Sequence, residues 1–278
     1  MSDLSQPSPL TSHELATTPD HLVVLMPCPW AMISAEALEE IFAEHWQELA
    51  HVTWLDESEQ DAEQVACAEV RFESANEVVV AKVVVEPPLE GLEQSLSMSV
   101  DPLTQAEALL LRDHASLWRI VLPAGKKLGR RAMKRASQLM ATFIEAGASA
   151  AFLPGVMRLH SARFIKKETM DLHDPQGMTN LFVGAWHADG WMRTRGLTAF
   201  ELPEIEVRAD QGLNAAYFHL MDISANMLMQ MARFPSGAEL QIGPRTLRIE
   251  EADHRFEEAP DPLVPSNGYY GIQRILAR

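Results

Sequence analysis

The sequence predicts an α+β fold built from two ferredoxin-like, βαββαβ-like halves, with helices packed on mostly antiparallel sheets. Short runs rich in β-branched residues alternate with longer segments of helical periodicity. Their order is strand, helix, two strands, helix, strand and helix, followed by three strands, a helix and a strand. Hydrophobic residues make up 47% of the 278 residues, which is enough for a sizeable core. We therefore expect one lobe over residues 21–113 and a second over residues 114–278.

The first lobe begins with a strand and an amphipathic helix. Residues 1–20 are rich in Ser, Thr and Pro, and this composition predicts a disordered leader outside the fold. The apolar run 21–27 predicts a buried strand that stops at a pair of prolines. Ser34 is a suitable N-cap, and the residues after it carry apolar side chains at helical spacing. The other face of this helix is almost wholly acidic.

Two more strands and a helix complete the first lobe. The runs 65–72 and 78–85 predict strands, and the second has so little polar interruption that we expect it inside a sheet. Asp101, followed by a proline in the first helical position, predicts the start of a helix over residues 103–113. Residues 116–122 predict the first strand of the second lobe.

The second lobe contains the clearest predicted helix of the chain, over residues 129–146. It ends at Gly147, in the position where glycine commonly terminates a helix. The other predicted elements are strands over 150–153, 180–186, 204–207 and 246–250, a long loop or short helix over 160–179, a methionine-rich helix over 213–234, and a strand or helix over 269–276.

The composition excludes several classes of protein. A net charge of −16 argues against binding to nucleic acid or anionic lipid, because both are polyanions. No run approaches the ~20 apolar residues that span a bilayer, and the first residues do not resemble a signal peptide. The two cysteines, Cys28 and Cys67, lack metal-ligand spacing, so we interpret them as buried thiols. We therefore expect a cytoplasmic protein without nucleic-acid or membrane partners.

The charge is distributed unevenly along the chain. Residues 36–77 contain thirteen Asp and Glu against one Arg, whereas residues 126–167 contain ten Lys and Arg against one Glu. Such complementary segments favour fast association of partners. One hypothesis is that the acidic segment of one copy binds the basic segment of another, which would give a homo-oligomer.

One segment, Trp191–Val207, has the sequence WMRTRGLTAFELPEIEV. Its TRGL at 194–197, Phe200 and LPEIE at 202–206 resemble the signature of an uncharacterised bacterial family, the domain of unknown function 4261 family. The resemblance extends less specifically over residues 21–250. It implies an architecture and no catalytic residue, because that family has no assigned activity. Glu201 stands where we expect a glycine in the family pattern.

Two groups of residues are candidates for binding a small ligand. The basic run Lys126, Lys127, Arg130 and Arg131 opens a helix after a strand, a position that can bind phosphate, but it lacks the spacing of a P-loop. A solvated helix face is the usual explanation of such a run. Trp191, Arg193 and Arg195 alternate along a strand and would suit a carboxylate or a peptide if that face lined a groove.

Two glutamates of the same segment invite a further hypothesis. Glu204 and Glu206 alternate along the strand, so we expect both on the solvent side, where they can form an ion-paired ladder with the arginines of the neighbouring strand. No spacing of a catalytic triad or metal site is present, although Asp171, His173 and Asp174 are the densest set of potential ligands. We predict no catalytic residue, no metal and no cofactor.

Two functions follow, in order of preference. The first is a non-enzymatic module that captures a basic protein partner through Glu39, Glu40, Glu44 and Glu48; immunity proteins that neutralise basic toxins share this acidic profile. The alternative is a binder of small anionic ligands, or an enzyme, that uses a groove near Trp191, Arg193 and Arg195.

Overall fold

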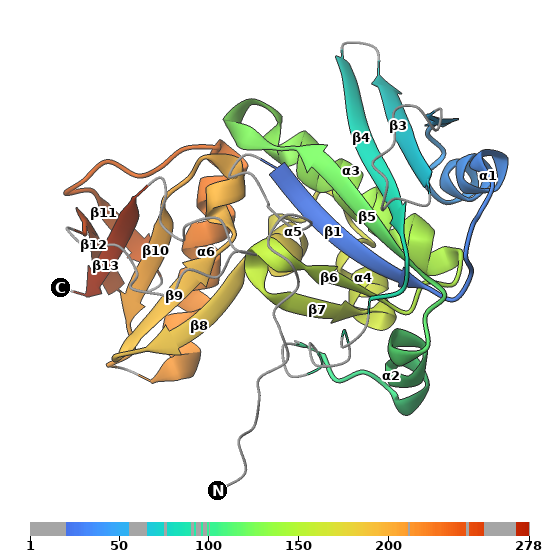
Figure 1. The fold of residues 1–278 in the computed structure, drawn as a ribbon. Coiled ribbons are helices and arrows are strands. Elements are labelled where there is room, and N and C mark those ends of the chain that lie inside the picture. Colours follow the sequence, from blue (N-terminus) through green and yellow to red (C-terminus); the bar gives the residue numbers. More distant parts are fainter. Residues whose placement is uncertain are drawn as a thin grey trace, which may run out of the picture.

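The computed structural model shows an α+β protein with two sheets, as the sequence predicts (Figure 1). The structure describes residues 21–55, 66–74, 77–89, 101–210, 212–242, 245–252 and 271–277, together with residues 92, 96 and 99. The predicted leader, residues 1–20, lies outside this part of the chain. No helix among the described residues is long and apolar enough to cross a membrane.

The first sheet has seven strands in the order β2-β3-β4-β5-β1-β6-β7, and every neighbouring pair is antiparallel. Its strands are β1 (His21–Cys28), β2 (Ala50–Trp54), β3 (Ala66–Ser74), β4 (Glu77–Glu86), β5 (Ser116–Pro123), β6 (Ala150–Leu153) and β7 (Arg158–Ser161). Strands β4, β5, β1 and β6, which occupy its centre, have the strand order of a ferredoxin-like sheet. The hairpin of β2 and β3 extends one edge of this sheet, and β7 extends the other.

Helices cover both faces of the first sheet. On one face pack α1 (Ala35–Trp46) and α3 (Gly125–Glu145), which also contact each other. Ser34 caps α1 as predicted, since its hydroxyl accepts a hydrogen bond from the backbone N–H of Ala37. The opposite face is covered by α2 (Gln105–Arg112), which buries Leu111 against Leu25 of β1. This helix begins at a capping box of Thr104 and Glu107 and not at Asp101, because the two side chains satisfy each other's backbone N–H groups.

The second sheet is mixed, in the order β11-β12-β13-β10-β9-β8. Its strands are β8 (Gly184–Ala188), β9 (Trp191–Arg195), β10 (Glu204–Arg208), β11 (Glu239–Ile242), β12 (Arg245–Glu251) and β13 (Ile272–Ala277). Strands β10 and β13 are parallel, whereas the other neighbouring pairs are antiparallel. The two halves therefore share the α+β class but have different strand orders.

Three helices pack against one another where the halves meet. Helix α6 (Leu213–Gln230) lies on β9 and β10 and contacts both α3 and α5 (Pro175–Phe182), while α4 (Ala162–Glu168) packs on α3 and β7. Short 3-10 turns, η3 (Pro154–Val156) and η4 (Leu197–Phe200), join the strands nearby. Buried residues of both halves, from Val24 of β1 to Ile275 of β13, form one hydrophobic cluster. One large core thus joins the two halves, and a second, smaller cluster lies under α2.

Several boundaries differ from the sequence predictions. The sheets divide after β7 and not at residue 113, because β5 and β6 lie on either side of β1 in the first sheet. The segment 180–186, predicted as one strand, is the end of α5 followed by β8. Strands β2, β7 and β11 were not predicted, and each has only four or five residues at or near a sheet edge. Runs this short carry almost no periodicity.

His160 of β7 makes stability depend on pH. Its side chain is fully buried, its Nε2 lies 3.0 Å from the Leu181 carbonyl oxygen, and burial lowers its pKa from 6.5 to about 4. The folded protein therefore resists protonation that the unfolded chain accepts. We expect about 3 kcal/mol of unfolding free energy to be present above pH 6.5 and to be lost as the pH falls to about 4.

Urea unfolding at pH 7, 5.5 and 4.5 measures this loss, with His160→Gln as the comparison. Glutamine keeps an N–H donor for Leu181 and does not titrate. The variant should therefore lose less stability than the original chain over this range. Parallel losses in both proteins would contradict the role of His160.

Candidate functional site

The segment Trp191–Val207 is a strand, a 3-10 turn and a second strand, as the sequence predicts in outline. The turn begins at Gly196, whose φ is +119°, and a Cβ there would lie 2.3 Å from the backbone oxygen of Phe182. Glu201 ends the turn with a φ of 56°, a left-handed conformation that favours glycine. That conformation gives a physical reason for the glycine expected at this position in the family pattern.

A buried carboxylate holds the turn in place. The Glu204 side chain is fully buried and accepts four hydrogen bonds at distances of 2.6–3.1 Å. The donors are the Thr194 hydroxyl, the Gly196 backbone N–H, and the backbone N–H and hydroxyl of Thr198. Burial raises the pKa of Glu204, and these hydrogen bonds act in the opposite direction. Three residues that carry the family resemblance, Thr194, Gly196 and Glu204, therefore belong to one hydrogen-bond network.

Glu206 belongs to an ion-paired ladder, which the sequence predicted between the arginines and glutamates of these strands. Arg193 of β9 lies 3.3 Å from one carboxylate oxygen of Glu206, and Arg274 of β13 lies 2.7 Å from the other. The expectation that Glu204 and Glu206 face solvent is wrong, because both are fully buried. Arg193, Arg274 and neighbouring side chains cover the carboxylate of Glu206.

Two tryptophans, Trp186 and Trp191, make cation–π contacts with the arginines of this sheet face. The guanidinium groups of Arg193 and Arg195 lie 5.2 and 5.9 Å from the ring centroid of Trp186, and those of Arg208 and Arg274 lie 5.1 and 4.5 Å from that of Trp191. Such cation–π contacts stabilise by about 0.5–1 kcal/mol at exposed sites and by more when they are dry. The arginines of this face thus already have aromatic contacts within the chain.

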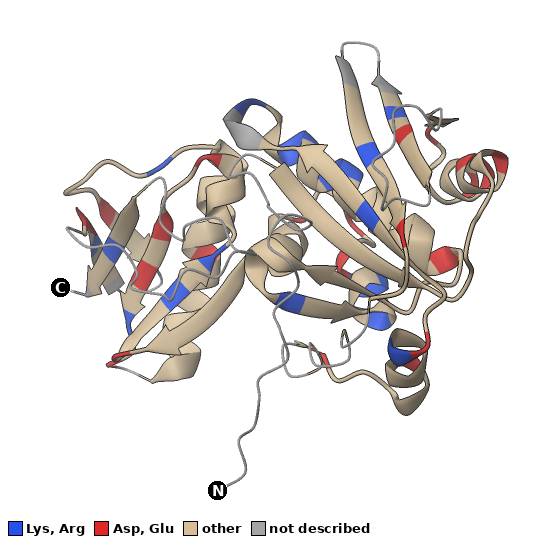
Figure 2. Ribbon diagram, in the orientation of Figure 1, with Lys and Arg blue, Asp and Glu red and all other residues tan. Residues whose placement is uncertain are grey.

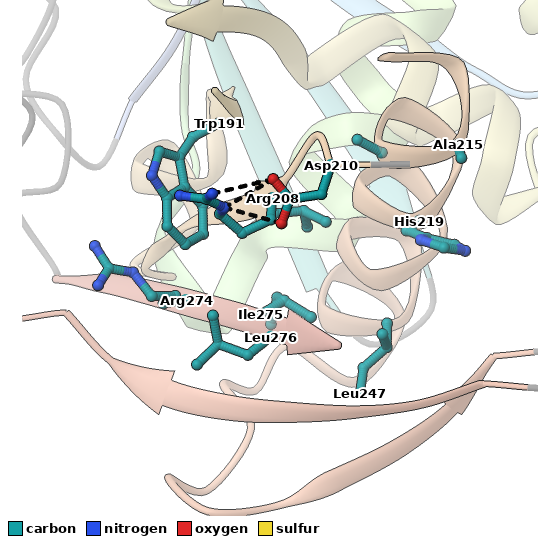
Figure 3. Close-up of a pocket in the computed structure, with 11 residues that line it drawn as sticks. Trp191, Arg208, Asp210, Ala215, His219, Leu247, Arg274, Ile275 and Leu276 are labelled. Atoms are coloured by element: carbon teal, nitrogen blue, oxygen red, sulfur yellow. Dashed lines mark hydrogen bonds and ion pairs between the residues drawn. The ribbon is translucent and has the colours of Figure 1, made fainter. Parts of the chain in front are cut away.

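A pocket of about 360 Å³ lies beside Trp191, at the carboxyl ends of β10 and β13 and next to the first turns of α6 (Figure 3). Arg193 and Arg195, predicted to line a groove with this tryptophan, do not line it; Arg208 and Arg274 do. Arg208 is paired with Asp210 at 3.1 Å, and Arg274 with Glu206. Arg208 and Arg274 are therefore already paired with carboxylates of the same chain.

A second cleft, of about 430 Å³, lies where α3, α5 and α6 meet. Four cations of α3 line it, and we call it the basic cleft: Lys127, Arg130, Arg131 and Lys134. Three of these are among the basic residues that the sequence singled out; the side chain of the fourth predicted residue, Lys126, lies outside the described part. The remaining walls are mainly apolar and come from α3, α6 and the segment before α5, but they also include His173 and the carboxylate of Asp174.

The electrostatics of the basic cleft favour an anion. The first turn of α3 contains no acidic residue, and no side chain caps it. A helix N-terminus carries a partial positive charge, so basic residues there repel the helix dipole as well as one another. Lys127, Arg130 and Arg131 are exposed, and among the described residues neither Lys127 nor Arg130 has an ion-pair partner. These positive charges repel one another, and a bound anion would offset the repulsion.

Acidic residues gather on α1 (Figure 2), but two of the four glutamates predicted to bind a partner are engaged within the chain. Glu39 accepts a 2.6 Å hydrogen bond from the backbone N–H of Val52, and Glu48 pairs with Lys134 at 2.6 Å and with Arg135. Burial raises the pKa of Glu48, but these two cations outweigh it and lower the pKa to about 2. Only Glu40 and Glu44 of the four predicted partner-binding residues are exposed without a described partner.

The contacts of Glu48 also bear on the predicted homo-oligomer. The acidic and basic segments meet within one chain, because α1 packs against α3 and Glu48 reaches two of its cations. The charge complementarity of the segments is therefore satisfied in part by the monomer. It gives no separate support to a contact between copies.

The described residues contain no group of three or more His, Cys, Asp and Glu placed to hold a metal ion. Asp171 and Asp174 serve local structure instead: each accepts hydrogen bonds from backbone N–H groups two or three residues ahead. Cys28 and Cys67 are buried, and burial raises the pKa of the Cys28 thiol. A thiol of raised pKa is a poor nucleophile.

The residues that sequence analysis missed lie far away along the chain. Arg274 is 68 residues from Glu206, and no local pattern indicates that β13 pairs with β10.

The resemblance to the domain of unknown function 4261 family stays a prediction. Comparisons with protein-family models, with curated proteins and with solved structures found no match.

Proposed function

We propose that the chain is a binding protein for an anionic ligand, which it holds in the basic cleft. The observation that carries this proposal is the group of exposed cations Lys127, Arg130 and Arg131, which line one cleft beside Lys134, whose ammonium group already pairs with Glu48. A cation 4 Å from a ligand anion attracts it by about 1 kcal/mol in water and about 4 kcal/mol in the less polar surroundings of a protein surface. Several such contacts support specific binding.

The other two candidate surfaces offer less to a ligand. Arg208 and Arg274 beside Trp191 are neutralised by carboxylates of the same chain, so an anion there would compete with existing ion pairs. Of the four predicted glutamates on or just after α1, Glu39 and Glu48 are engaged within the chain. Capture of a basic protein partner by Glu40 and Glu44, in the manner of an immunity protein, remains the second candidate, because these two residues stay exposed.

A thermal-shift titration with inorganic triphosphate tests the proposal. At 100 times its dissociation constant a ligand adds about 2.7 kcal/mol to the unfolding free energy, so we expect a clear rise in melting temperature. The triple variant Lys127→Ala, Arg130→Ala, Arg131→Ala should lose this rise. Added salt should weaken the binding in the original chain, because the cations are exposed.

A matched triple variant controls for net charge. Arg112, Arg233 and Arg248 are exposed cations outside the cleft, and their replacement by alanine removes the same total charge. This control should respond to triphosphate like the original chain. If neither triphosphate nor other polyanions raise the melting temperature, the proposal fails, and reversing the charges of Glu40 and Glu44 becomes the next test of function.

A further inference from the structure

The basic cleft continues into a second hollow along α6, which we call the outer groove. The two share Asp174, Pro175, Ala225 and Met229 as lining residues, so they adjoin, and we call the pair of hollows the channel. The outer groove has a volume of about 480 Å³ and extends past α5 to the edge strand β11. A ligand bound at the cations of α3 therefore has room to extend along α6.

The chemistry of the walls changes along this channel. At one end lie the cations of the basic cleft, with Met178 and Met231 beside them, and the residues common to both hollows are Asp174, Pro175, Ala225 and Met229. At the far end lie carboxylate and amide groups, those of Asp222, Asn226 and Gln176. The carboxylate of Asp222 disfavours a second anionic group there and accepts hydrogen bonds from hydroxyl or amino groups.

The length of the channel sets the size of the ligand. Asp222 and Met231 are nine residues apart on or directly after α6, and at 1.5 Å per residue they are separated by about 13 Å along the helix axis. A nucleoside triphosphate is longer than this span when extended, so with its phosphates at the cations it reaches into the outer groove. A small inorganic anion would fill only the basic end.

We propose that the ligand of the basic cleft is a nucleoside triphosphate, with its phosphates at Lys127, Arg130 and Arg131 and its base and sugar in the outer groove. This inference rests on the proposed function. Met229, which lines the outer groove, suits a planar base, because thioether sulfur makes favourable contacts with aromatic rings. The polar groups of Asp222 and Asn226 suit the edge of the base or the sugar hydroxyls. An anion with an acyl chain fits less well, because its tail would bury these polar groups without partners.

Isothermal titration calorimetry with ATP, GTP, CTP and UTP, each compared with inorganic triphosphate, tests the inference. At least one nucleotide should bind tenfold or more tightly than inorganic triphosphate, since only the nucleotide contacts the outer groove. The variant Asp222→Ala, Asn226→Ala should reduce the affinity for that nucleotide to the level of inorganic triphosphate. Its affinity for inorganic triphosphate should stay unchanged.

A control variant on the same helix is Asn214→Ala, Gln230→Ala, because both residues are exposed on α6 and line neither hollow. It should bind the nucleotide like the original chain. Equal affinity for inorganic triphosphate and all four nucleotides would overturn the inference and leave the proposed function standing. Nucleotide affinity that survives the Asp222→Ala, Asn226→Ala change would also overturn it. Absence of binding by every phosphate compound would overturn the proposed function itself.

Discussion

Replacing Gly196 with alanine is expected to lower the unfolding free energy by about 4 kcal/mol, from the cost of a disfavoured backbone conformation and of overpacking. Its φ of +119° is one that residues with a side chain rarely adopt. A Cβ would also lie 2.3 Å from the Phe182 backbone oxygen and 2.4 Å from Cγ1 of Val156. Neither neighbour moves easily, because both belong to segments packed in the core.

Gly190→Ala separates the two contributions. Gly190 also has a positive φ, +77°, but a Cβ there would meet no atom within 4 Å. This control should cost only the backbone penalty, about 1 kcal/mol. Urea unfolding at pH 7 measures both variants. Equal, small losses would show that the close approach of Gly196 to Phe182 carries no energetic weight.

Replacing Glu204 with alanine is expected to cost about 4 kcal/mol or more, because it leaves several buried donors without an acceptor at about 1–3 kcal/mol each. The affected groups are the N–H groups of Gly196 and Thr198 and the hydroxyls of Thr194 and Thr198, of which the Thr194 hydroxyl keeps only a 3.5 Å contact with the Ile205 carbonyl oxygen. No solvent reaches the site to replace the carboxylate, since Glu204 is fully buried. The 3-10 turn that precedes β10 should therefore lose its fixed geometry.

Glu204→Gln is the matched variant, because its amide oxygen can still accept from Gly196 and Thr198. It should lose clearly less stability than the alanine variant. Denaturant unfolding gives the free energies, and hydrogen exchange at the amides of Gly196 and Thr198 reports the local effect. If alanine costs no more than glutamine, the hydrogen bonds to this carboxylate do not hold the turn.

Sequence periodicity and capping chemistry predicted the longer elements well. Helix α1 begins after the Ser34 cap, and β1, β4 and β5 lie within two residues of their expected bounds, because burial against a core imposes a regular apolar pattern. Helix α3 starts at Gly125, earlier than expected, because its first turn is basic and not amphipathic. The short strands β2 and β11 expose alternate residues, but with five and four residues they are too short for the alternation to be recognised in the sequence.

The candidate sites were predicted less completely. The run of charge identified Lys127, Arg130 and Arg131. The apolar residues that form a cleft together with these cations come from α6 and the segment before α5. In the same way Arg193 was identified, whereas its partnership with Arg274 through Glu206 depends on the pairing of β10 with β13. Side chains from distant segments become neighbours only through the packing of the whole chain.

The sequence by itself determined the α+β class, the amphipathic and acidic character of α1, the basic start of α3, and the strand, turn and strand of Trp191–Val207. These are local properties, set by side-chain period, capping and charge. Only the tertiary structure decided that Glu204 and Glu206 are buried, that Glu48 pairs with Lys134, and that one core joins both halves. The physical reason is that burial and ion pairing depend on strand order and helix packing, which link residues far apart in the chain.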